Sequence, residues 1–199
     1  MQSKVAARLA RSWARLTEAL ARTRACLAEA LTKALARRRV PLGFVLGALT
    51  AWLARPTPRS LAAGAVLAGL GEALRVWAAG HLEKGREVTR SGPYRLVRHP
   101  LYVGSTIMGI GLAVASARPI VAVIIGAYLV LTLSAAIRTE EAWLGRAFGD
   151  AYRQYREGRG PASERRFSLA RARANREHRA ALGALLVLLF LAWRARQGL

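Results

Sequence analysis

The chain has 199 residues, of which 53% are hydrophobic, and it carries a formal net charge of +21. A soluble domain of this size rarely combines both properties, so we expect apolar and charged residues to be segregated along the chain. A single cysteine, Cys26, excludes an internal disulfide framework and a thiolate metal cage.

The first predicted element is a basic amphipathic helix over residues 1–39. Its apolar side chains recur at helical spacing between Arg and Lys residues: Val5, Leu9, Trp13, Leu16, Leu20, Leu27 and Leu31. The segment lacks the uninterrupted apolar core and cleavage site of a secretory signal. We expect it to lie on the inner membrane surface, where anionic lipid headgroups attract its charge. Packing on the protein's own cytoplasmic face, or on another subunit, fits the pattern equally well.

Five apolar runs follow, separated by charged or proline-containing segments. They are Val40–Ala54, Leu61–Gly80, Leu101–Ala117, Pro119–Ile137 and Ala180–Trp193. The three central runs approach the roughly 20 residues that a helix needs to cross a bilayer core of about 30 Å. The first and last are shorter and also fit tilted, interfacial or re-entrant segments. The pattern predicts an all-helical integral membrane bundle of four or five spans, with residues 40–199 forming one membrane domain.

Small residues and one pair of charges predict how the spans pack. Glycines recur within the runs, at Gly64, Gly69, Gly71, Gly109, Gly111 and Gly126, and glycines let membrane helices approach closely. Glu72 and Arg75 are three residues apart, which puts them on one side of a helix. Because charges in hydrocarbon are costly, we expect both to face the bundle interior, a cavity or each other.

The distribution of basic residues predicts the topology. Ten of the 32 Lys and Arg residues lie in residues 1–39, five in residues 81–98 and eleven in residues 138–179. By the positive-inside rule these three segments face the cytoplasm, which favours a protein of the inner membrane. Nucleic-acid binding is a weaker explanation, because the basic residues flank apolar spans and no nucleic-acid-binding motif accompanies them.

Two polar segments flank one predicted hairpin. Residues 91–104 combine prolines, glycines, arginines, tyrosines and His99 just before a membrane helix, and Pro100 suits the first turn of that helix. Glu140 and Glu141 follow the end of the next run. Because Arg118-Pro119 makes a tight turn between the two helices, both outer ends of the hairpin return to the same surface. We therefore expect the His99 loop and the two glutamates to be neighbours.

The motif Arg98-His99-Pro100-Leu101-Tyr102-Val103-Gly104, followed after 35 residues by Glu140-Glu141, resembles the isoprenylcysteine carboxyl methyltransferases and the related phospholipid N-methyltransferases. Gly92-Pro93-Tyr94 before the motif, and Phe148-Gly149 with Tyr152 and Tyr155 after it, are similar to the family as well. The resemblance spans roughly residues 70–157. It departs after Tyr155, where the family continues with Val-Pro and this chain does not.

The resemblance implies a cytoplasmic pocket for S-adenosylmethionine and a membrane lipid or lipid-linked substrate. The implied cofactor-binding residues are Tyr94, Arg98, His99, Pro100, Tyr102, Gly104, Glu140 and Glu141. The Arg98-His99 loop and Tyr102 would hold the amino-acid end of the cofactor, and Glu140 or Glu141 would meet its ribose hydroxyls or amino group. Glu141 and His99 are the predicted catalytic residues, because an amine acceptor must lose a proton.

The predicted reaction is methylation of a hydrophobic acceptor, most simply a carboxyl group that becomes a methyl ester. N-methylation of a phospholipid headgroup is the alternative within the same chemistry. A non-catalytic membrane helix bundle is the alternative of another class, and the oligomeric state stays open. No metal site is predicted, because His81, His99 and His178 are too scattered and lack partners at ligand spacing.

Overall fold

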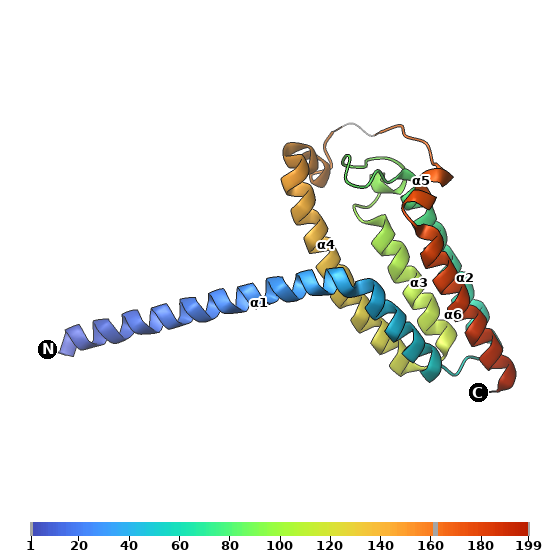
Figure 1. Ribbon diagram of the computed structural model, residues 1–199, viewed down its shortest axis with the longest axis horizontal. Coiled ribbons are helices and arrows are strands. Elements are labelled where there is room, and N and C mark those ends of the chain that lie inside the picture. Colours follow the sequence, from blue (N-terminus) through green and yellow to red (C-terminus); the bar gives the residue numbers. More distant parts are fainter. Residues whose placement is uncertain (1, 161–162, 199) are drawn as a thin grey trace.

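The computed structural model describes residues 2–160 and 163–198, and these residues form helices and no strands. The elements are α1 (Gln2–Leu53), α2 (Pro58–His81), the 3-10 helix η1 (Gly92–Arg95), α3 (Pro100–Ser116), α4 (Pro119–Arg156), α5 (Leu169–Ala174) and α6 (Glu177–Gln197). The predicted all-helical class is confirmed. Figure 1 shows α2, α3, α4 and α6 side by side with the last part of α1, while the rest of α1 extends away from this bundle.

Three helices of the described chain are long and apolar enough to cross a membrane, namely α2, α4 and α6. The last apolar run, which looked short in the sequence, is part of a 21-residue helix. In contrast, α3 has only 17 residues, because Pro100 begins it and the left-handed Ala117 ends it before Pro119 begins α4. The apolar segment 41–53 at the end of α1 is also shorter than a full span.

The predicted amphipathic helix and the first apolar run form one continuous helix. α1 has 52 residues and contains Pro41. Figure 1 shows α1 bending between its free part and the part that packs against α4. A proline inside a helix removes one backbone hydrogen bond and commonly causes such a bend. The expected boundary near residue 40 is therefore a change of direction within one helix.

Glycines bring the backbones of α2 and α3 into close contact. A Cβ atom on Gly64 would lie 2.4 Å from the carbonyl oxygen of Gly111, and one on Gly71 would lie 2.6 Å from that of Gly104. The close packing predicted for Gly64, Gly71 and Gly111 is therefore confirmed, and Gly104 joins the same contact. Gly69 and Gly126, in contrast, have open space where a Cβ would point, so they do not mark helix contacts. Gly109 packs on Leu129 of α4.

The charged pair of α2 faces the bundle interior as predicted. Arg75 Nε lies 3.5 Å from Glu72 Oε2, and Arg75 Nη2 lies 2.7 Å from Glu177 Oε2 at the start of α6. Arg75 also donates a hydrogen bond to Ser105 of α3. Arg75 therefore links α2 to both α3 and α6. Its partner in α6, Glu177, lies 102 residues later in the sequence.

The segment before α6 folds over the end of α2. Asn175 Nδ2 donates hydrogen bonds to the carbonyl oxygens of Ala79 (2.9 Å) and Leu82 (3.0 Å), which the end of a helix leaves without partners. Arg165 Nη1 lies 2.7 Å from Glu87 Oε1, and Arg171 Nε lies 3.3 Å from Glu83 Oε1. The loop after α2 is thus anchored by the C-terminal part of the chain.

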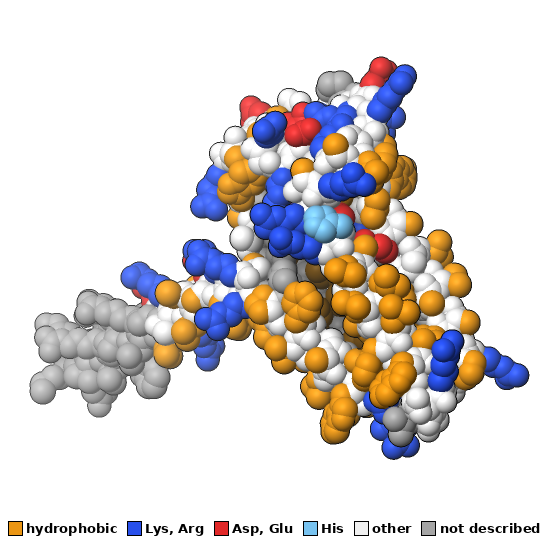
Figure 2. Space-filling model, turned by 45° about the vertical axis from the view of Figure 1, so that its right-hand side comes forward, with side chains coloured by type: hydrophobic (Ala, Val, Ile, Leu, Met, Phe, Trp, Pro, Cys, Tyr) orange, Lys and Arg blue, Asp and Glu red, His pale blue; other side chains and the backbone are white. Residues whose placement is uncertain are grey.

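Charge is concentrated at one end of the bundle, which we call the polar end. It comprises η1, the start of α3, and α4 beyond Ile137. In Figure 2, hydrophobic side chains cover much of the bundle on this face, and Lys, Arg, Asp and Glu gather at its upper end, with fewer basic residues at the lower end. The pattern matches a membrane-embedded body with one strongly charged surface.

The close contact of α2 and α3 predicts a stability difference between two glycine substitutions. Gly64→Ala places a methyl group against the backbone of α3, so we expect a loss of about 1–3 kcal/mol in the free energy of unfolding. Gly126→Ala, also within an apolar helix but facing open space, serves as the control and should not destabilise the protein. Thermal unfolding in detergent measures both. Equal melting temperatures for the two variants would contradict the observed contact.

Candidate functional site

The loop before α3 packs against a buried histidine, His81. Gly92 has a φ of +54°, and a Cβ there would lie 2.5 Å from the ring of His81. His81 Nδ1 is 3.1 Å from the hydroxyl of Ser91, and both residues are buried. The turn then continues into η1, whose Tyr94 is only 8% exposed. Packing on α2 thus fixes the loop that carries the first predicted site residue.

The predicted meeting of the His99 loop and the two glutamates is confirmed. Glu141 Oε1 lies 3.1 Å from His99 Nε2 and 3.3 Å from Arg98 Nη1. The Tyr102 hydroxyl donates a hydrogen bond of 2.6 Å to Glu140 Oε2. The rings of His99 and Tyr102 stack with their centroids 5.6 Å apart. Each glutamate therefore meets a different residue of the motif, and the α3–α4 hairpin brings them together.

The surroundings keep one carboxylate ionised and one phenol neutral. Burial alone would raise the pKa of Glu141, but the hydrogen bond from His99 and the charges of His99 and Arg98 outweigh it, and the pKa is lowered. Burial raises the pKa of Tyr94, and the negative charge of Glu140 adds to this effect. At neutral pH the site therefore offers a charged acceptor and a neutral hydroxyl group.

The remaining predicted residues have distinct environments. The carbonyl oxygen of Tyr94 accepts a hydrogen bond of 2.8 Å from the Tyr155 hydroxyl, which ties η1 to the end of α4. Pro100 is buried at the first position of α3. Gly104 faces Gly71 and Arg75 of α2, so the structure places it in the helix contact and not beside the two glutamates.

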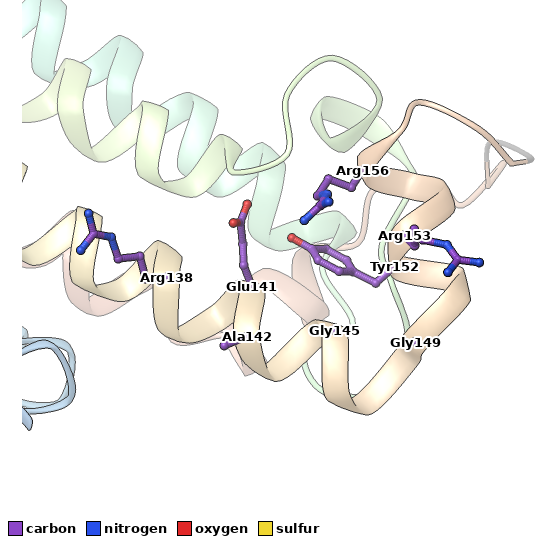
Figure 3. A pocket seen from close by; sticks show the side chains of 8 residues that line it. All are labelled: Arg138, Glu141, Ala142, Gly145, Gly149, Tyr152, Arg153 and Arg156. Atoms are coloured by element: carbon purple, nitrogen blue, oxygen red, sulfur yellow. The ribbon is translucent and has the colours of Figure 1, made fainter. Parts of the chain in front are cut away.

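A bend in α4 forms a groove beside Glu141. Gly149 has φ 45° and ψ −115°, a backbone conformation that L side chains rarely adopt. After this residue the chain turns back, and Figure 3 shows Tyr152 and Arg156 directed toward the side of the groove where Glu141 lies. The groove has a volume of about 450 Å³, and its lining residues are Arg138, Glu141, Ala142, Gly145, Gly149, Tyr152, Arg153 and Arg156.

Several polar groups of the groove lack partners in the described part of the chain. The buried Tyr152 hydroxyl has no partner at full hydrogen-bond geometry among the described residues, but it lies close enough to Glu141 for the two groups to shift each other's pKa. Arg138 and Arg156 form no ion pair within residues 2–160 and 163–198, whereas Arg153 Nη2 lies 3.0 Å from Asp150 Oδ1. Burial, followed by the charge of Glu141, raises the pKa of Tyr152, so its hydroxyl stays protonated. The groove thus offers two cations and a phenol to a ligand.

Sequence reasoning missed Arg138 and Arg156 as site residues. Part of the signal was present, because residues 138, 141, 145, 149 and 152 recur at three- or four-residue spacing and share one face of a helix. The position of Arg156 depends on the bend at Gly149, and spacing along a straight helix would not reveal it.

The bend at Gly149 predicts a second stability difference. Gly149→Ala forces a non-glycine residue into a positive-φ conformation, which we expect to cost about 1–3 kcal/mol. Gly145→Ala is the matched control, because Gly145 lies one turn earlier in the same helix and a Cβ there meets open space. Chemical denaturation in detergent compares the two. An unchanged midpoint for Gly149→Ala would contradict the bend.

Parts of the chain are similar to known proteins. The chain is 33% identical over 140 residues to the cobalt-zinc-cadmium resistance protein CzcN of Cupriavidus metallidurans, and the aligned part covers 67% of this chain and 64% of that protein. The chain therefore spans just under two thirds of that relative's length. No solved structure matches the chain significantly. Residues 60–151 match the phospholipid methyltransferase family (PEMT).

Proposed function

We propose that the protein is an S-adenosylmethionine-dependent methyltransferase that acts on a hydrophobic or lipid-linked acceptor. The observation that supports this most directly is the network of Arg98, His99 and Tyr102 with Glu140 and Glu141 at the polar end of an apolar hairpin. The family match covers both halves of this network. A site at the end of membrane helices is open to an acceptor that arrives from the bilayer.

The residues present fit the cofactor. Arg98 and His99 are suited to the carboxylate of its amino-acid end, and Glu140 and Glu141 to ribose hydroxyls or the amino group. The Tyr152 hydroxyl, which lies beside Glu141 in the lining of the groove, is a further donor. When bound, S-adenosylmethionine supplies the methyl group of the reaction.

The task of the protein's own residues is mainly to position the acceptor. Methyl transfer from a sulfonium is an in-line displacement in which alignment of the reacting atoms lowers the barrier. A carboxylate acceptor is already ionised at neutral pH and needs orientation more than a base. An amine acceptor must lose a proton, and Glu141 or an unprotonated His99 would be the group that accepts it.

Carboxyl O-methylation of a lipid-linked acceptor is our first choice of reaction, because the motif order most resembles that branch of the family. Arg138 and Arg156 support an acceptor with an anionic group, since neither is neutralised within the described chain. N-methylation of a phospholipid headgroup is the second candidate. It is favoured by the family match, and the phosphate of a phospholipid suits the same arginines.

The apolar helices and the family indicate an integral membrane protein. We propose in addition that the polar end faces the cytoplasm from the inner membrane. The basic residues of segments 81–98 and 138–179 support this orientation, because cytoplasmic loops carry an excess of Lys and Arg. In this view residues 40–199 form the methyltransferase domain.

Cofactor binding can be measured by calorimetry with the purified chain. We expect saturable binding of S-adenosylmethionine, and Glu140→Gln should weaken it, because a carboxylate that can accept hydrogen bonds from the ligand is lost. A hydrogen bond to a charged group contributes about 1.5–3 kcal/mol, so the dissociation constant should rise by roughly 10-fold or more.

Glu18→Gln is the matched control for this measurement. Glu18 lies on the exposed part of α1, paired with Arg22, so its replacement should leave binding unchanged. If the wild-type chain gives no saturable heat, the proposed cofactor is wrong. If both variants bind equally, the assignment of Glu140 is wrong.

The acceptor can be identified by mass spectrometry after incubation with the cofactor. One reaction contains a prenylcysteine analogue and another contains phosphatidylethanolamine, and the gain of one methyl group is scored in each. We expect the analogue to gain the methyl group, and Arg138→Gln with Arg156→Gln should raise its KM more than it lowers kcat, because these residues would hold the anionic group. A gain by phosphatidylethanolamine alone would replace our first choice with the second candidate.

A further inference from the structure

The free part of α1 presents a row of exposed leucines. Leu20, Leu27 and Leu31 are 58%, 64% and 61% exposed. They are spaced by seven and four residues, which places them on one face of the helix. The side chains of Val5, Leu9, Trp13 and Leu16, which continue the same sequence pattern, lie outside the described part. Of the three locations that the sequence allowed, packing of this leucine face on the protein's own bundle is therefore excluded for residues 20–31.

The charges of α1 leave an excess of positive charge beside the leucines. Glu18 pairs with Arg22 at 3.7 Å, and Glu29 pairs with Lys33 at 2.5 Å. These pairs use both acidic residues of the chain before Glu72. Arg24, Arg37 and Arg38 form no ion pair within the described residues, and Arg24 and Arg38 lie on the leucine face by helical spacing. Long arginine side chains can reach phosphates while the neighbouring leucines enter an apolar layer.

The orientation of α1 is set by its contact with α4. Lys33, and more weakly Arg146 of α4, lower the pKa of Glu29. Glu29 lies opposite Leu20, Leu27 and Leu31 on the helix. The leucines therefore lie on the side of α1 away from the Glu29–Lys33 ion pair.

The free part of α1 also runs in the direction expected of a helix that lies on the surface of a bilayer. Figure 1 shows its free part running crosswise to α2, α3, α4 and α6. The same helix continues into the apolar segment 41–53, which packs on α4. A helix that lies across the bundle and continues into an apolar segment packed on α4 is suited to the surface of a bilayer.

We propose that the leucine face of α1 (Leu20, Leu27 and Leu31) docks on the surface of a bilayer that contains anionic phospholipids, with Arg24, Arg37 and Arg38 contacting lipid phosphates. A second copy of the chain is the competing occupant. Two copies of this helix would bring like charges together, whereas anionic headgroups attract them. The positive charge of the helix therefore favours an anionic lipid surface over a second copy of the chain. This inference does not depend on the methyltransferase reaction.

The experiment uses an environment-sensitive fluorophore on the full chain in nanodiscs. In a Cys26→Ser background, Leu27→Cys carries the label on the leucine face and Ala25→Cys carries it on the opposite side, where Ala25 is exposed. The nanodiscs contain phosphatidylcholine alone or a mixture with phosphatidylglycerol. We expect a blue shift and a severalfold gain in emission for the Leu27 label only, larger with phosphatidylglycerol and reduced by added salt.

A further variant tests how much the arginine charges contribute to binding of the lipid surface. Arg24→Gln combined with Arg38→Gln should remove the dependence on phosphatidylglycerol, and both side chains are exposed, so the fold should tolerate the change. Emission from the Leu27 label that is the same in both nanodiscs, or equal to that of the Ala25 label, would overturn the proposal. Disulfide cross-linking between two copies through Leu27→Cys would overturn it in favour of a second copy.

Discussion

The backbones of α2 and α3 meet at Gly64 and Gly111, and again at Gly71 and Gly104, with no room for a Cβ at these points. Because lipid tails are as apolar as the helices, such close packing is a main source of association within a membrane. This contact also sets how α3 is rotated. Since Gly104 must face α2, Tyr102 is turned toward α4, where its hydroxyl meets Glu140.

Charge within the bundle is arranged under a second constraint, that a buried ion needs a partner. Arg75 meets Glu72 and Glu177 and thereby joins α6 to α2. At the polar end, where the side chains are more exposed, Arg98 and His99 meet Glu141. Arg138 and Arg156, which form no ion pair within the described residues, line the groove beside Glu141 together with Tyr152. An anionic group of a ligand suits these two cations.

The C-terminal part of the chain contributes more than another apolar helix. It lies beyond the region that matches the family, yet Asn175 caps α2, and Arg165 and Arg171 pair with Glu87 and Glu83 in the loop that leads to η1. The loop that carries Tyr94 and His99 is therefore supported from two sides. The family segment and its surroundings form one structural unit at the polar end.

The sequence by itself determined the helical class, the turn at Arg118-Pro119, the pairing of Glu72 and Arg75 away from lipid, and the meeting of the His99 loop with Glu140 and Glu141. Each follows from local chemistry or from the return of a hairpin to its starting surface. It did not determine that residues 2–53 form one helix, that Gly104 faces α2, or that Arg156 reaches the groove. Those features depend on contacts between distant helices and on one glycine conformation at Gly149, which only the tertiary structure decided.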